Sequence, residues 1–183
     1  MNAQTEKLRL AGAAGVIEAL RDVPPPGVHP RGVAVIAHPH PLFGGTMDNK
    51  VVQTLARAFV GAGWTAVRFN FRGVGTSEGA HDEGRGETDD MLALVQQVAP
   101  EGPLSIAGFS FGAFVAINAL QTLWSSREVE RVALVGASVA RVPPPPLPVD
   151  SHERVLVVHG EQDDTVALAA VMDWARPQSL PVT

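Results

Sequence analysis

Short apolar segments alternate with amphipathic ones from Gly32 onward, and this alternation predicts the secondary structure. Apolar residues that recur every three or four positions favour a helix, whereas short continuous runs rich in valine and isoleucine favour a buried strand. We therefore expect strands at residues 32–38, 64–70, 103–109, 129–136 and 153–160, and helices at residues 50–60, 87–98, 112–124 and 165–176.

The N-terminal part of the chain has a different pattern. LRLAGAAGVIEALRDV predicts two short strands joined at residues 11–15, which is typical of an antiparallel hairpin, and PPPG at residues 24–27 follows as a loop. The later strands are continuously apolar, as in a parallel sheet covered by helices on both faces. The sequence thus predicts one α/β domain over residues 1–183, with a hairpin and a doubly wound, mostly parallel sheet.

Composition excludes several classes of function. The net charge is −5 and the basic residues are scattered, so we expect no nucleic-acid or membrane-surface partner. There is no cysteine, which excludes disulfides, thiolate chemistry and cysteine-based zinc sites. The apolar runs are too short to cross a bilayer and the first residues lack a signal-peptide pattern, so a cytoplasmic location is the expectation.

Gly108-Phe109-Ser110-Phe111-Gly112 is a G-x-S-x-G motif between a predicted strand and a predicted helix. That context is required for a nucleophile elbow, a sharp turn that lifts the serine hydroxyl clear of the sheet. The next backbone N–H lies at a helix N-terminus, where it can stabilise an oxyanion. We therefore expect Ser110 to be a nucleophile and the Phe111 N–H to be an oxyanion donor.

HPHPLFGG at residues 38–45 follows the first parallel strand, where a second oxyanion donor is expected from the backbone. Pro39 and Pro41 have no N–H and cannot donate. His40 and Leu42 remain as candidates, with His40 first.

The same loop offers an alternative chemistry. His38 and His40 have a spacing that suits metal ligands, with His159 and Asp163 as the further ligands they would need. A metal-dependent hydrolase is therefore one alternative, although we expect both imidazole rings simply to pack and hydrogen-bond around the loop.

Two adjacent carboxylates, Asp163 and Asp164, follow the last predicted strand, where an acid that orients a histidine is expected. Only one of them can face the site, and the other is placed to cap the helix predicted from Thr165; the alternative is that both cap. The acids Glu87, Asp89 and Asp90 are interpreted as a solvated first helical turn.

FRGVGTSEG at residues 71–79 contains a G-x-G. The third glycine of a dinucleotide loop is missing and no helix follows directly, so we interpret the segment as a structural turn in which Arg72 is ion-paired.

The hairpin, HPHPLFGGTMDNKVV, FNFRGVGTSEG, AGFSFG and VVHGEQDDTV together resemble the small, lidless bacterial α/β-hydrolases, relatives of the dienelactone-hydrolase-like and serine-aminopeptidase-like groups. The resemblance implies a sheet of eight strands, a Ser–Asp–His triad, cleavage of ester or related acyl bonds in a small-molecule substrate, and no cofactor. The pattern H-G-x-x-D-x-x-V of that family selects Asp163 as the acid, with Val166 following. A Pro-rich loop at residues 143–148 stands where a helical lid would be, which implies an open site.

In the resembled family the triad runs serine, acid, histidine along the chain, whereas all six histidines here precede Asp163. Residues 179–183 resemble the start of a final strand, so we expect the last strand and helix to be missing or incomplete. We also expect the chain to be nearly inactive, and the strand at residues 153–159 to have an unpaired edge. The alternatives are that His40 reaches Ser110 from the opposite loop, or that the protein is a non-catalytic member of the fold.

Overall fold

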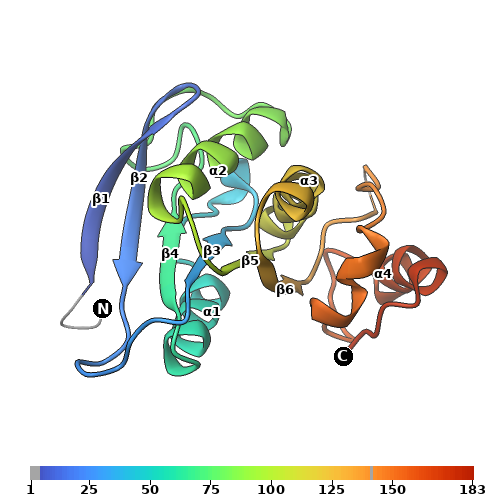
Figure 1. Ribbon diagram of the computed structural model, residues 1–183. Coiled ribbons are helices and arrows are strands. Elements are labelled where there is room, and N and C mark those ends of the chain that lie inside the picture. Colours follow the sequence, from blue (N-terminus) through green and yellow to red (C-terminus); the bar gives the residue numbers. More distant parts are fainter. Residues whose placement is uncertain (1–4, 141) are drawn as a thin grey trace.

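Seven strands form one mixed sheet in the computed structural model, which describes residues 5–140 and 142–183. The sheet order is β1-β2-β4-β3-β5-β6-β7, with the hairpin at one end and the last strands and α4 at the other (Figure 1). The strands are β1 Glu6–Gly12, β2 Gly15–Asp22, β3 Val33–Ala37, β4 Thr65–Phe69, β5 Leu104–Phe109, β6 Val129–Val135 and β7 Val155–Val158.

The helices are α1 Lys50–Gly61, α2 Arg85–Val98, α3 Phe111–Ser126 and α4 Leu168–Ala175. Short 3-10 turns lie at Pro41–Phe43, Val149–Arg154 and Arg176–Gln178. Within the described residues, no helix is both long enough and apolar enough to span a bilayer.

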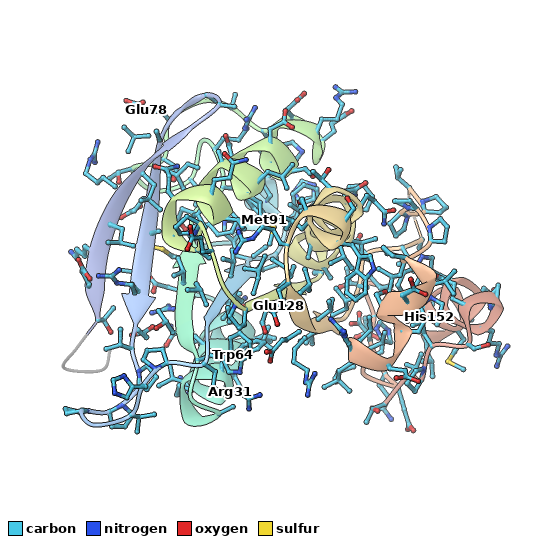
Figure 2. All side chains as sticks on the ribbon, in the orientation of Figure 1. Arg31, Trp64, Glu78, Met91, Glu128 and His152 are labelled. Carbon is cyan, nitrogen blue, oxygen red and sulfur yellow. The ribbon has the colours of Figure 1, made fainter. Side chains whose placement is uncertain are left out.

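The two faces of the sheet are buried by different helices, as the continuous apolar strands predicted. Val35 belongs to the larger core, which includes residues of α2, α3 and α4, among them the fully buried Met91 of α2 (Figure 2). Its neighbour Ile36 points to the other face and packs with Val52 and Ala56 of α1. The alternation follows from the two-residue period of a strand, and it explains why both kinds of position are apolar.

Pairing directions confirm the predicted fold class. β1 and β2 form the antiparallel hairpin, β2 is antiparallel to β4, and the pairs from β4 to β7 are all parallel. The chain passes from β3 to β4 on one side and later returns to β5 on the other side of β3. The carboxyl ends of β3 and β5 therefore flank a topological switch point, where open α/β sheets bind their ligands.

The expectation of an unpaired edge on β7 was wrong for the carboxyl-terminal end of that strand. Val182 forms a parallel bridge with Val157, and the Thr183 N–H donates to the Val157 carbonyl at 2.9 Å. The His159 N–H in turn donates to the Thr183 carbonyl. Residues 182–183, after α4, therefore pair with β7 as the start of a further parallel strand would. The sheet of the described residues has seven strands.

Candidate active site at the switch point

Ser110 lies at the sharp turn from β5 into α3. Its backbone has φ 56° and ψ −117°, a region that non-glycine residues rarely adopt and that costs free energy unless the surroundings enforce it. The Ser110 N–H donates to the Val135 carbonyl at 2.9 Å, and the Ser110 carbonyl accepts from the Ser138 N–H at 3.3 Å. The neighbouring strand end thus fixes the turn, and Ser110 remains half-buried at the carboxyl edge of the sheet.

The two glycines of the motif are required because the backbone approaches itself closely. A Cβ on Gly108 would lie 2.2 Å from the Gly112 carbonyl oxygen, and a Cβ on Gly112 would lie 2.4 Å from the Ala37 carbonyl oxygen. α3 therefore rests directly on the ends of β5 and β3. Phe111 is its first residue, so its N–H belongs to the group that has no intrahelical acceptor.

The loop after β3 turns back toward α3. A Cβ on Gly45 would lie 2.1 Å from the Pro39 carbonyl oxygen, so this turn also requires glycine. The Leu42 N–H donates to Nδ1 of His40 at 3.3 Å, which engages the second of the two predicted oxyanion candidates. The His40 ring lies 4.7 Å from the Phe111 ring, so the structure brings the first candidate to the start of α3.

His38 is fully buried and both of its ring nitrogens are hydrogen-bonded. Nδ1 donates to the Pro39 carbonyl at 2.6 Å, and Nε2 accepts from the Phe71 N–H at 3.0 Å. Burial lowers the pKa of His38 to about 4, which keeps the ring neutral. Because a metal would have to displace one of these bonds, the donor set does not fit the metal-site alternative, and the packing interpretation of this ring is confirmed.

The two carboxylate oxygens of Asp163 have different surroundings. Its Oδ1 accepts from the Thr165 N–H at 2.8 Å and the Val166 N–H at 2.9 Å, while its Oδ2 lies 3.7 Å from where a Cβ on Gly136 would be. Gly136 directly follows β6, so this oxygen faces the neighbouring strand end. The backbone N–H of Val166, with that of Thr165, holds the pKa of Asp163 below its usual value.

The structure corrects the prediction for Asp164 and for the start of the last helix. Asp164 is exposed, and the capping bonds predicted for it are made by Asp163. α4 begins at Leu168 rather than Thr165, because the turn around Asp163 and the bond from His159 Nε2 to the Val166 carbonyl take residues 165–166 out of the helix.

The solvated-turn interpretation of the acids near α2 was wrong for two of the three. Glu87 is 0% exposed and Asp90 is 2% exposed, whereas Asp89 is exposed, as predicted. Arg72 donates to Asp90 at 2.7 Å, which confirms its predicted ion pairing.

Glu87 accepts from His81 Nδ1 at 2.7 Å, and the His81 ring reaches the loop of His40. Sequence reasoning missed this pair. The available signal was a glutamate three residues after Gly84, the second half of a capping box.

Comparison with known proteins gives consistent matches. A family model described as Hydrolase_4, serine aminopeptidase S33, matches residues 28–156. XC6422 from Xanthomonas campestris, described as an a/b serine hydrolase without lid, is 36% identical, and the alignment covers 100% of this chain and 84% of that one with a TM-score of 0.83. An alpha-beta serine hydrolase homologue from Coxiella burnetii is 34% identical over 97% of this chain and 84% of its own, with a TM-score of 0.80.

An uncharacterized protein of Rickettsia prowazekii, RP471, is 43% identical over 90 residues, which are 47% of this chain and 38% of that protein. The match therefore spans less than half of this curated relative. The segment matched by the family model includes Ser110 and the loop after β3, and it ends before Asp163.

Proposed function

The chain belongs to the serine aminopeptidase S33 family of α/β-hydrolases, and from this premise we propose that it hydrolyses ester or related acyl bonds with Ser110 as the nucleophile. The observation that supports this most strongly is the strained backbone of Ser110, at φ 56°, between a strand end and a helix N-terminus. Strain of this kind concentrates at functional sites, where it is part of the mechanism. A turn with a purely structural role could use glycine here without this steric strain.

In the proposed reaction, Ser110 Oγ attacks the carbonyl carbon of the substrate, its proton passes to a base or to solvent, and the carbonyl oxygen becomes an oxyanion. Collapse of this intermediate expels the alcohol, which takes up a proton, and water then releases the acid from Ser110. The N–H of Phe111, at the start of α3, donates to that oxyanion and gains from the helix dipole. The backbone N–H of His40 is the proposed second donor, since the Leu42 N–H is engaged by the His40 ring. A tetrahedral intermediate would thus be held between the ends of β3 and β5.

Asp163 is the proposed acid that orients a histidine base. Its Oδ1 is held by two backbone N–H groups, which fixes the side chain and leaves Oδ2 on the side of Gly136. The lowered pKa of Asp163 keeps the carboxylate ionised at neutral pH, as the role requires. Asp164 is exposed and has no place in the proposed mechanism.

None of the six histidines follows Asp163 in the sequence, although the base of this fold does so. His159 is tied to the Val166 carbonyl through Nε2, and His38 is buried with both nitrogens bonded. We therefore propose that the 183-residue chain turns over slowly, because Ser110 without a base remains a neutral and weakly nucleophilic hydroxyl.

An ester-hydrolysis assay tests this proposal. The chain, its Ser110→Ala variant and the control Ser138→Ala are each assayed on p-nitrophenyl acetate. We expect a small Ser110-dependent rate, several powers of ten below that of a complete triad, which Ser138→Ala retains. A Ser110-dependent turnover of about 10 per second would contradict the proposal that the base is missing. A rate that Ser110→Ala fails to lower would contradict the proposal that Ser110 is the nucleophile.

A further inference from the structure

The His81 ring packs against the side chains of both residues proposed as oxyanion donors. Its centroid lies 4.8 Å from that of His40 and 5.5 Å from that of Phe111, and the His40 and Phe111 rings are themselves 4.7 Å apart. The three rings therefore form a closed cluster that joins the loop after β3 to the start of α3. His81 comes from a third segment, the connection between β4 and α2.

A buried carboxylate holds this ring in place. Glu87 is 0% exposed, and its Oε1 accepts from His81 Nδ1 at 2.7 Å and from the Asp82 N–H at 3.0 Å. Its Oε2 accepts from the Gly84 N–H at 2.8 Å. Both oxygens accept from backbone N–H groups, and we assign His81 Nδ1 as the donor of the remaining bond. This bond fixes the plane of the ring.

The backbone beside this pair is strained at Glu83, and the next residue is a glycine at positive φ that has no room for a side chain. Glu83 has φ 52°, and Gly84 has φ 96° with a Cβ position only 2.6 Å from the Phe114 ring. The bond from Gly84 to Glu87 would by itself complete the second half of a capping box for α2. The additional hydrogen bond with His81 brings an imidazole into contact with the loop of His40, at the cost of burying a carboxyl group.

From these contacts we infer that His81 is a positioning residue for the oxyanion hole, and that Glu87 orients it. The inference rests on the proposed function of Ser110. The ring fills the space beside His40 and Phe111 and fixes the separation of the two segments that present their N–H groups. Oxyanion stabilisation depends on preorganised donors within hydrogen-bond distance of the developing charge, so a small displacement of the His40 loop weakens it.

Binding of phenylboronic acid measures this property without needing a catalytic base. Ser110 Oγ forms a bond to boron, which becomes tetrahedral and anionic, and the hydroxyl proton is released to solvent. Benzoate carries the same ring but stays planar and forms no covalent bond. Boron NMR follows the Ser110-dependent tetrahedral adduct, and ligand-observed proton NMR follows benzoate.

We expect His81→Ala to weaken the boronate adduct by about tenfold and to change benzoate affinity by less than about twofold, because only the adduct uses the oxyanion donors fully. His81→Phe retains a ring against His40 and Phe111 and should stay within about threefold of the unmodified chain. It also provides the measurement if His81→Ala does not fold. Arg85→Ala, an exposed change in the first turn of α2 near Glu87, is the control and should alter neither affinity.

An unchanged boronate affinity in His81→Ala, an equal loss for both ligands, or a loss in His81→Phe as large as in His81→Ala would each overturn the inference. If the unmodified chain forms no tetrahedral adduct that Ser110→Ala abolishes, the proposed nucleophile fails and the inference fails with it. The two failures are therefore distinguishable.

Discussion

At the scale of single residues, the environment of each polar side chain decides its role more than its type does. Asp163 and Asp164 are chemically identical neighbours, yet only Asp163 bonds the backbone of the following turn. The histidines divide in the same way, since His38 is locked and neutral whereas His81 is directed by a carboxylate. The sequence identifies these residues as candidates. The direction of each side chain was not predictable, because it depends on turns that involve residues distant in the chain.

The neutral state of His38 makes stability depend on pH. Its folded pKa of about 4 lies below the usual value of 6.5, so between these values the unfolded state binds the proton and the folded state does not. Stability is therefore unaffected above pH 6.5 and falls as the pH drops toward 4, by about 3 kcal/mol in total for this group. Urea unfolding at a series of pH values, with His38→Gln as the non-titrating control, measures the effect. Parallel curves for the two proteins over this range would contradict it.

The two aspartates after β7 should respond differently to truncation. Asp163→Ala removes the acceptor of two backbone N–H groups and should lower the free energy of unfolding by about 1 kcal/mol at pH 7, whereas Asp164→Ala should leave it nearly unchanged. Because the folded pKa of Asp163 is lowered, its contribution is present above its unfolded pKa and is lost as the pH falls through the folded value. Chemical denaturation at pH 7 compares the two variants, and the opposite ranking would return the capping role to Asp164.

At the scale of elements, the sharp turn at Ser110 depends on the close contact of β5 with α3. Gly108→Ala places a Cβ 2.2 Å from the Gly112 carbonyl oxygen, and the contact is between backbones, so no side chain can move aside. We expect a loss of about 3 kcal/mol or more in the free energy of unfolding. Gly61→Ala at the end of α1 meets nothing within 4 Å and should instead stabilise by about 0.5–1 kcal/mol. Thermal unfolding of the two variants tests both expectations, and a tolerated alanine at Gly108 would refute this account of the turn.

The elements themselves were predictable because their hydrophobic periods are clear. The α3 segment is apolar nearly all round, and every predicted parallel strand forms, within a few residues of its expected bounds. The start of α4 was not predictable, since side-chain bonds from Asp163 and His159 compete with the first helical turn. The burial of Glu87 was also hidden, because an acid in a first helical turn is ordinarily solvated.

At the scale of the whole molecule, the site follows from the order of strands. β3 and β5 are neighbours although β4 lies between them in the sequence, so the loop of His40 and the turn of Ser110 meet at one edge. The motifs in the sequence identify these two segments, and the doubly wound topology places them together. The contact of His81 with both segments could not be predicted, because it depends on the path of the connection between β4 and α2.

The proposal that Ser110 is the nucleophile is tested most directly by covalent labelling. The chain is incubated for hours with an excess of a fluorophosphonate, because labelling is slow if, as proposed, no base activates Ser110, and the modified peptide is identified by mass spectrometry. The account predicts one adduct, on Ser110, that is absent from Ser110→Ala and present in Ser138→Ala. An adduct on Ser105, Ser138 or Ser151 in place of Ser110, or equal labelling of the Ser110→Ala protein, would contradict it.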